Sequence, residues 1–284
     1  LTLTFSWLNE ETIVRTLVFS PSGEWVASAG TDEAIALWNT ANGDRFQLFT
    51  GHTRDITDMA LNAPGTRLIS ASRDGTARLW DLTSAAIVRD FIGHTSGAIG
   101  VYLPQARAIL SGSGDTTLRL WDIASARTIR EFRGHSGAVL ALDVTRDGQR
   151  YLSGGRDNTV RLWTLDSDTP LTMRGHAGAI SAVSLTPDET EAVSVGRDGA
   201  VIRWNLATGD EAKRYVKAEG SASAQFALAL SADGTRIAAG GDDQVVTVWD
   251  AQSGAVLQTL SGHERSVRAV AFSPDGRFMV SGAT

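Results

Sequence analysis

A tryptophan that closes a short apolar run recurs six times along this chain, and an aspartate stands six residues before each copy. Successive tryptophans lie 41 to 45 residues apart, and the pairs are Asp32/Trp38, Asp74/Trp80, Asp115/Trp121, Asp157/Trp163, Asp198/Trp204 and Asp243/Trp249. A Gly-His pair keeps the same period and accounts for every histidine, at His52, His94, His135, His176 and His263. Self-similarity at a period of about 40–45 residues is typical of a β-propeller built from four-stranded blades. Because such a fold mostly holds partners, the period favours interaction over catalysis.

The second repeat shows how one period becomes a blade. Residues 67–70 and 76–80 read as two strands, separated by the turn at Asp74-Gly75. Asp-Gly between short strands is a strong hairpin signal, because such turns need positive φ angles that these residues tolerate. Apolar positions upstream, at 56–61, and downstream, at 87–91, predict an inner and an outermost strand. Closing such sheets into a ring shields most strand edges from solvent.

The repeats can be compared letter by letter. The second reads GHTRDITDMALNAPGTRLISASRDGTARLWD, and the others close with SAGTDEAIALWN, SGSGDTTLRLWD, SGGRDNTVRLWT, SVGRDGAVIRWN and AAGGDDQVVTVWD. On these residues the chain resembles the Trp-Asp (WD) repeat family over its whole length. The resemblance implies an all-β, seven-bladed β-propeller of four-stranded antiparallel blades, whose last blade is incomplete here and is closed by the N-terminal strand. Residues 1–284 then form one propeller, with blades at about 9–50, 51–92, 93–133, 134–174, 175–219, 220–261, and 262–284 together with strand 1–8.

The resemblance also assigns the polar markers a structural role. In this family the Gly-His imidazole, a serine ten residues before the tryptophan, the turn aspartate and the tryptophan form a buried hydrogen-bonded tetrad. By position the tetrads are His52/Ser70/Asp74/Trp80, His94/Ser111/Asp115/Trp121, His135/Ser153/Asp157/Trp163 and His176/Ser194/Asp198/Trp204. A Ser, a His and an Asp in one repeat could form a catalytic triad, but their recurrence in four blades favours packing.

Two repeats depart from the tetrad pattern. The first has Asn9-Glu10 in place of Gly-His, and the sixth has Gly220-Ser221 there and Ala239 in place of the serine. A buried hydrogen-bond network that has lost some of its members is less favourable than no network, so the sixth repeat has lost the histidine and the serine of its tetrad together. Asp243 is therefore expected to contribute less to the stability of the protein than Asp157. The longer interval after Trp204 predicts an insertion at the outer edge of blade five, within 207–217.

The seventh repeat stops before its expected turn aspartate and Trp strand. Residues 1–8 align with the outermost strand of the other repeats, so the strand that should join them to the blade is missing. An unpaired edge would be costly. We expect the polypeptide to continue past Thr284, as the absence of an initiator Met also suggests; alternatively, another chain or residues 1–7 in a shifted role fill the gap.

Function classes are narrowed mainly by what the chain lacks. Phosphate-binding, dinucleotide, zinc-protease and serine-hydrolase motifs are absent, so no catalytic residue, metal site or cofactor is expected. A formal net charge of −6 argues against broad nucleic-acid binding. No long apolar run or signal peptide is present, which indicates a cytoplasmic protein without membrane insertion. The sequence therefore favours a protein–protein interaction scaffold, a regulatory or sensing module of a larger protein or complex, whose partners are other proteins or flanking domains. The alternative is a ligand-sensing or catalytic propeller fused to an enzymatic or redox domain.

Basic residues recur on the face that carries the Gly-His loops. The residue before the turn aspartate is, in blades one to six, Thr31, Arg73, Gly114, Arg156, Arg197 and Asp242. Arg54 and Arg265, two residues past their histidines, fall on the same face, whereas the other Gly-His loops are small there. Arginines suit bidentate recognition of carboxylates or phosphates, so these six charged residues predict a site for an acidic partner. Alternatively, the arginines are solvated or paired with neighbouring aspartates.

Two aromatic residues stand out on the opposite face. Trp25 and Phe278 lie three residues before Ser28 and Ser281, where the other repeats are mostly polar. The first and last blades are neighbours in a closed ring, so both rings are expected to be exposed side by side and to contact a flanking segment or domain. Alternatively, the rings pack on each other or on long neighbouring side chains.

Overall fold

Strands joined by turns make up the computed structural model, which describes residues 13–102, 108–217 and 223–284. The strands form six four-stranded antiparallel sheets and one two-stranded sheet. The first three sheets contain β1 (Val14–Phe19), β2 (Trp25–Gly30), β3 (Ala34–Asn39) and β4 (Arg45–Thr50); β5 (Ile56–Leu61), β6 (Arg67–Ser72), β7 (Thr76–Asp81) and β8 (Ala86–Ile92); and β9 (Ala98–Tyr102), β10 (Ala108–Ser113), β11 (Leu118–Asp122) and β12 (Thr128–Phe132). The next three contain β13 (Val139–Val144), β14 (Arg150–Gly155), β15 (Thr159–Thr164) and β16 (Leu171–Arg174); β17 (Ile180–Leu185), β18 (Glu191–Gly196), β19 (Val201–Asn205) and β20 (Glu211–Tyr215); and β21 (Gln225–Leu230), β22 (Arg236–Gly241), β23 (Val246–Asp250) and β24 (Val256–Leu260). The last sheet contains β25 (Val267–Phe272) and β26 (Met279–Ala283).

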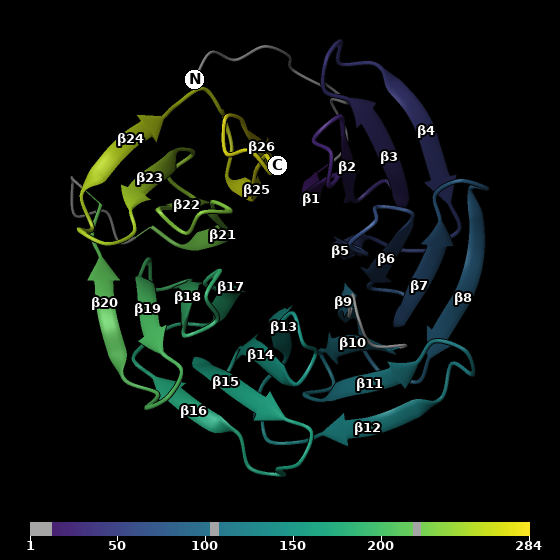
Figure 1. Ribbon diagram of the computed structural model, residues 1–284, viewed down its shortest axis with the longest axis horizontal. Coiled ribbons are helices and arrows are strands. Elements are labelled where there is room, and N and C mark those ends of the chain that lie inside the picture. Colours follow the sequence, from purple (N-terminus) through teal and green to yellow (C-terminus); the bar gives the residue numbers. More distant parts are fainter. Residues whose placement is uncertain (1–12, 103–107, 218–222) are drawn as a thin grey trace.

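The sheets are arranged as blades around a central axis (Figure 1). The first strand of each blade lies innermost, and the fourth strand of the four-stranded blades lies on the rim (Figure 1). β25 contacts both β1 and β21, so the last blade lies between the sixth and the first. The predicted all-β propeller of four-stranded antiparallel blades is thus confirmed for six blades, and the seventh is seen as two strands. The closing strand predicted at 1–8 and the residues Asn9 and Glu10 lie outside the described part of the chain.

The hydrophobic core lies between blades rather than within one of them. Each of six clusters of buried side chains joins two successive blades. The repeated tryptophan packs against the outer strand of the preceding blade: Phe49 and Trp80 meet edge-on with ring centroids 5.8 Å apart, and Phe132 and Trp163 at the same distance. Such aromatic pairs contribute about 0.5–1.5 kcal/mol beyond the burial of their area. Each tryptophan therefore fixes its blade onto its neighbour.

The insertion in blade five overlaps the predicted range 207–217 only at its last two residues. The turn between β19 and β20 resembles those of the other blades, and β20 ends at Tyr215. The extra length lies between β20 and β21, which begins only at Gln225; the matching connection in the preceding blade runs from Arg174 to Ile180. The extra residues therefore lie in the connection between blades five and six. The tryptophan spacing could not place them, since it measures only the total length between repeats.

Candidate partner-binding face

Four buried hydrogen-bonded tetrads hold the loops at one end of the propeller. In blade two, His52 Nδ1 lies 2.8 Å from Asp74 Oδ2, His52 Nε2 lies 2.7 Å from Ser70 Oγ, and Trp80 Nε1 donates to the same Oγ at 2.8 Å. The same three contacts, at 2.7 to 2.9 Å, connect His94/Ser111/Asp115/Trp121, His135/Ser153/Asp157/Trp163 and His176/Ser194/Asp198/Trp204. All four predicted tetrads are confirmed.

The donors and acceptors of a tetrad fix the protonation state of its histidine. The tryptophan N–H can only donate and the ionised carboxylate can only accept, so the serine hydroxyl donates to Nε2 and Nδ1–H donates to the aspartate. Burial lowers the pKa of His52, which Asp74 opposes only in part. Although burial opposes it, hydrogen bonds from Thr76 and His52 lower the pKa of Asp74 to about 2. The imidazole is therefore neutral, and the fully buried Ser70 is a structural group rather than a nucleophile.

The packing of the tryptophan explains why glycine precedes each tetrad histidine. A Cβ added to Gly93 would lie 3.0 Å from Trp121 Cη2 and 2.7 Å from Arg119 Nη1. A Cβ on Gly175 would lie 2.9 Å from Trp204 Cη2. Only glycine lets the loop cross this close to the indole ring, so the Gly-His pair is required by packing.

Blade six replaces its tetrad with groups from the longer connection. Trp249 Nε1 donates to the backbone carbonyl of Val216 at 3.2 Å, where other blades offer a serine. Asp243 pairs with the ammonium of Lys217, and the side chains of this pair are only 14% and 9% exposed. The insertion thus supplies partners for both remaining tetrad members, so the sequence-based premise that Asp243 is left without a buried partner is wrong.

The tetrads place the predicted arginines beside the Gly-His loops. The backbone N–H groups of Arg73, Arg156 and Arg197 donate to carbonyls of those loops, at Asp55, Ala138 and Ala179. Both sets of loops therefore lie at one end of the propeller. We use the name arginine face for this end, with the exposed charged residues Arg54, Arg73, Arg156, Arg197, Arg265 and Asp242.

The predicted residues of the arginine face differ in their surroundings. Arg73 Nη1 lies 3.2 Å from Asp55, and the Arg197 guanidinium lies 6.0 Å from the centroid of the Phe226 ring. Asp242 accepts a hydrogen bond of 2.6 Å from Ser266. Arg54, Arg156 and Arg265 make no ion pair with any residue that the structure describes. A polar hollow of about 430 Å³ lies between Arg54, Arg73 and the loop 95–97 of the next blade.

Further residues of this face lie on the inner strands and could not be recognised from repeat spacing. Six inner strands carry a β-bulge at their second residue, which re-aims that side chain. The bulged residues are Arg15, Thr57, Leu140, Ser181, Phe226 and Arg268. Arg15 donates to Asp55 at 2.8 Å, next to Arg73, and Arg268 lies 3.7 Å from the centroid of the Phe226 ring. The only available signal was an arginine at the same place in two inner strands.

Positive charge accumulates around these inner residues. Burial lowers the pKa of Arg268; Asp242 opposes this shift, and the charges of Arg15 and Arg197 add to it. Three arginines from blades one, five and seven are therefore close enough to repel one another. An anion bound among them would relieve that repulsion and could form bidentate hydrogen bonds.

The two aromatic residues at the opposite end of the propeller behave differently from each other. Phe278 is 52% exposed, with the Arg277 guanidinium 5.7 Å from its ring centroid. Trp25 is partly buried and packs against the core cluster between blades one and two, where Leu61 and Leu82 also lie. The expectation that both rings are exposed is wrong for Trp25, because its indole is large enough to reach the next blade.

Within the described ranges, no group of three or more His, Asp or Glu side chains is arranged to hold a metal ion. No helix in those ranges has the length and apolar character that crossing a bilayer requires.

Comparison with known proteins finds one family along the whole chain. The model described as "WD domain, G-beta repeat" matches residues 3–39, 43–81, 86–122, 126–164, 168–205, 216–250 and 254–284. Similar relatives include Periodic tryptophan protein 2 of Arabidopsis thaliana, 37% identical over 24% of this chain and 8% of the relative. COMPASS component SWD3 of Saccharomyces cerevisiae is 24% identical over 34% of each protein, and Target of rapamycin complex subunit wat1 of Schizosaccharomyces pombe is 31% identical over 28% of this chain and 25% of the relative. The matched segments thus span about a third or less of these relatives.

Proposed function

Because this chain belongs to the WD domain, G-beta repeat family, we propose that it is a protein-interaction scaffold whose arginine face binds an acidic peptide or surface of a partner protein. Two of its relatives are named as parts of assemblies, a COMPASS component and a subunit of a target of rapamycin complex. A corresponding role for this chain is a regulatory module within a larger protein or complex.

The proposal rests mainly on the position of Arg15, Arg197 and Arg268. These arginines come from three different blades and lie close enough together for their charges to act on one another. Within the described residues, the acidic side chains in contact with these arginines and with Arg73 are Asp55 and Asp242. Phe226 adds an aromatic surface against which Arg197 and Arg268 lie. Carboxylates of a partner would meet a partly desolvated cluster of cations, where charge pairs are stronger than at an exposed site.

The proposal is tested with a fluorescein-labelled hexaglutamate peptide and fluorescence anisotropy at low salt. Exchanging Arg73, Arg156 and Arg197 together for Glu is expected to weaken binding at least tenfold, because the charge of the whole face reverses. Arg268→Gln alone is expected to weaken it several-fold. Added salt should weaken binding to the wild-type protein, since partly exposed charges are screened.

A matched triple variant controls for total charge. Arg89, Arg127 and Arg146 are exposed and lie away from this face, so exchanging them for Glu changes the net charge equally. Binding should survive in this variant. Equal losses in both triple variants, or binding that persists after exchange of Arg73, Arg156 and Arg197, would contradict the proposal.

A further inference from the structure

The seventh blade has an open strand edge where the other six blades continue. In each of those six, the second strand pairs with the first strand on one side and with the third on the other. Within the described part of the chain, β26 pairs with β25 alone. Figure 1 shows β25 and β26 close to the axis, whereas the other blades extend to the rim. Such an edge presents backbone N–H and C=O groups to which a further strand can add.

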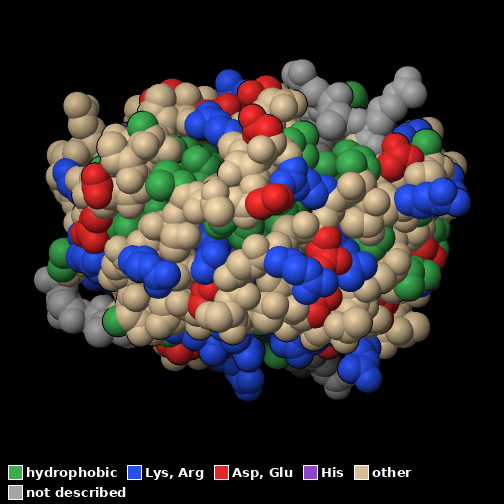
Figure 2. Space-filling view, turned by 90° about the horizontal axis from the view of Figure 1, so that it is seen from below, with side chains coloured by type: hydrophobic (Ala, Val, Ile, Leu, Met, Phe, Trp, Pro, Cys, Tyr) green, Lys and Arg blue, Asp and Glu red, His purple; other side chains and the backbone are tan. Residues whose placement is uncertain are grey.

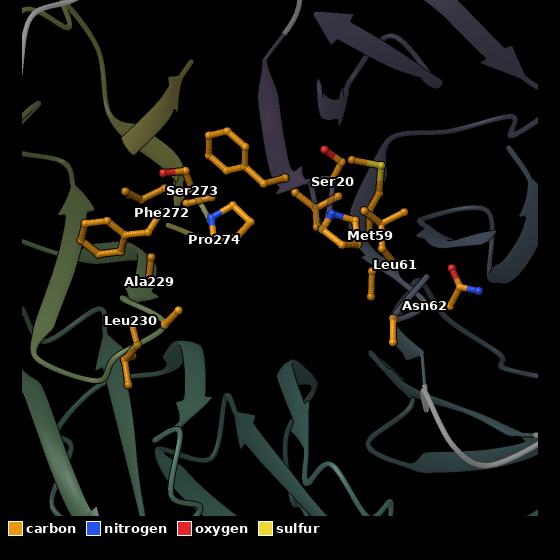
Figure 3. A pocket seen from close by; sticks show the side chains of 17 residues that line it. Ser20, Met59, Leu61, Asn62, Ala229, Leu230, Phe272, Ser273 and Pro274 are labelled. Atoms are coloured by element: carbon orange, nitrogen blue, oxygen red, sulfur yellow. The ribbon is translucent and has the colours of Figure 1, made fainter. Parts of the chain in front are cut away.

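The two strands of blade seven are held firmly on both sides. Val267 belongs to the core cluster between blades six and seven, and Phe272 packs against that cluster. Figure 3 shows Phe272 and Ala229 of blade six on the same side of a pocket between the inner strands. On the side of blade one, a Cβ added to Gly282 would lie 2.8 Å from Val14 Cγ1. The edge of β26 is therefore pre-formed, which lowers the entropic cost of binding.

Beside this edge there is space where other blades place their tryptophan. In the four tetrad blades, a Cβ added to the glycine before the histidine would lie 2.9 to 3.3 Å from the indole ring. A Cβ added to Gly262, the corresponding glycine of blade seven, would meet nothing within 4 Å. The Gly-His loop of blade seven thus has the form that an indole requires and leaves the place of the indole open.

The wall of this space in blade six is only partly covered. Leu260 lies in the outer strand of blade six and is partly buried. Its counterparts in blades one to five each pack against the tryptophan of the next blade and are 1% to 4% exposed: Phe49, Phe91, Phe132, Met173 and Tyr215. Leu260 therefore lacks the cover that a tryptophan gives to the same position elsewhere in the ring.

Blade seven also holds half of a tetrad. His263 Nε2 lies 2.7 Å from Ser281 Oγ, as in the four complete tetrads. Ser281 is partly exposed, whereas the serines of the complete tetrads are fully buried. Among the described residues, no indole donates to Ser281 Oγ and no carboxylate accepts from His263 Nδ1. The two missing members are thus an indole N–H donor and a carboxylate acceptor.

From this combination we propose that the open edge of β26 binds an extended segment of a partner protein that carries an aspartate six residues before a tryptophan. The segment adds to β26 as a third strand. Its indole occupies the space beside Leu260 and Gly262 and donates to Ser281 Oγ, and its aspartate accepts from His263 Nδ1. The complete blades define this occupant, because they show what the same groups bind when the site is filled. The arginines of the arginine face take no part in it.

The probe is a fluorescein-labelled peptide, Asp-Asn-Thr-Val-Arg-Leu-Trp-Thr, which is the sequence of residues 157–164 of blade four. Two matched peptides carry Ala in place of the Trp or Ala in place of the Asp. Fluorescence anisotropy is expected to show that the first peptide binds the wild-type protein at least tenfold more tightly than the peptide without Trp, and several-fold more tightly than the peptide without Asp. Equal binding of the peptide without Trp would overturn the proposal, because the indole would then not be recognised.

Hydrogen–deuterium exchange of the wild-type protein locates the bound peptide. The backbone amides of residues 279–283 should exchange at least tenfold more slowly when the peptide is present, because a new strand protects the edge of β26. The amides of β22, whose two edges are already paired, should be unaffected. Protection that is absent from residues 279–283 would overturn the proposal.

A matched pair of serine variants tests the hydrogen bond to the indole. Ser281→Ala is expected to weaken peptide binding several-fold. Ser28→Ala is the control, because Ser28 is the equivalent serine of blade one and its Oγ already accepts from Trp38 Nε1 at 2.7 Å. Binding should be unchanged in this control. Equal binding by both variants would contradict the proposed position of the indole.

Two further measurements separate this proposal from other outcomes. Exchanging Arg73, Arg156 and Arg197 for Glu should not weaken binding of this peptide, so its result is independent of the proposed function. Sedimentation velocity of the wild-type protein should show no self-association. Concentration-dependent self-association that the peptide abolishes would overturn the proposal, because the occupant would then be a second copy of this chain.

Discussion

The turn aspartate of a tetrad connects two loops that are far apart in the sequence. Asp157 accepts from His135 Nδ1 at 2.8 Å and from the backbone N–H of Ser136 at 3.1 Å, and it also accepts from Thr159 in its own turn. One carboxylate thus fixes the Gly-His loop, the hairpin turn and the protonation state of the histidine. This is why the arginine beside it, Arg156, has a defined place on the surface.

Removing that carboxylate should therefore cost stability. Asp157→Ala leaves the buried His135 Nδ1–H without its acceptor, which typically costs about 1–3 kcal/mol. Asp32→Ala serves as the matched control, since Asp32 occupies the same place in blade one and is exposed; its loss should stay within about 0.5 kcal/mol. Chemical denaturation of both variants measures the difference. Similar midpoints for the two would contradict the importance of the tetrad.

At the scale of strands and connections, periodic features were predictable and exceptions to the period were not. The turn Asp-Gly signals and the apolar runs predicted four strands in each repeat, and the inner strand predicted at 56–61 is the observed β5. Alternation of apolar residues cannot reveal a bulge, however, so the convergence of Arg15 and Arg268 was hidden. The replacement of a tetrad by Lys217 was equally hidden, because the lysine lies in an insertion with no counterpart in other repeats.

The structure changes the expectation for blade six. Asp243→Ala would leave the buried Lys217 ammonium unpaired, and Lys217→Met would leave the Asp243 carboxylate unpaired. Breaking a buried pair by removing one partner typically costs about 3–5 kcal/mol, so Asp243→Ala should be at least as destabilising as Asp157→Ala.

A double-mutant cycle tests this pairing. The double variant Lys217→Met with Asp243→Ala should be more stable than the two single losses added together, with a coupling of at least about 1 kcal/mol. Additive losses in denaturation midpoints would show that the two side chains do not depend on each other.

Across the whole molecule, positive charge is concentrated at one end of the axis. The arginine face has cations close to the axis, whereas the turns at the opposite end carry both acidic residues and arginines, as in Asp147 beside Arg146 and Asp275 beside Arg277. Figure 2, which views the rim, shows Lys and Arg side chains mixed with Asp and Glu over the rim, and several Lys and Arg side chains along its lower edge. An overall charge of −6 conceals this concentration of arginines, which becomes visible only when the loops are placed on their faces.

The same network recurs around the ring, so the protein as a whole should lose stability in acid. Burial lowers the pKa of the four tetrad histidines below the ordinary 6.5, so below about pH 6.5 the unfolded chain takes up protons that the folded chain does not. Asp74 and Asp115, each with a pKa of about 2, extend the loss below about pH 3.8. Burial raises the pKa of Asp143 to about 6, which acts in the opposite direction.

Denaturant unfolding at pH 7.5, 6 and 5 measures this dependence. Stability should fall between pH 7.5 and pH 5, because four histidines outnumber the single aspartate of opposite sign. Asp143→Asn should make the fall steeper, since it removes the contribution that favours folding in acid. A protein equally stable at pH 5 and pH 7.5 would contradict the neutral, buried state of the histidines.

The bulge in the inner strands has a consequence for how such a protein can change its binding preference over evolutionary time. The bulged position already holds five side-chain types in six blades, namely Arg, Thr, Leu, Ser and Phe, while the flanking residues keep their antiparallel pairing. Mutations there can accumulate without disturbing the ladder that builds the blade. If the arginine face binds a partner as proposed, recognition and folding depend on different positions of the same strand, and a change of partner can then proceed one blade at a time.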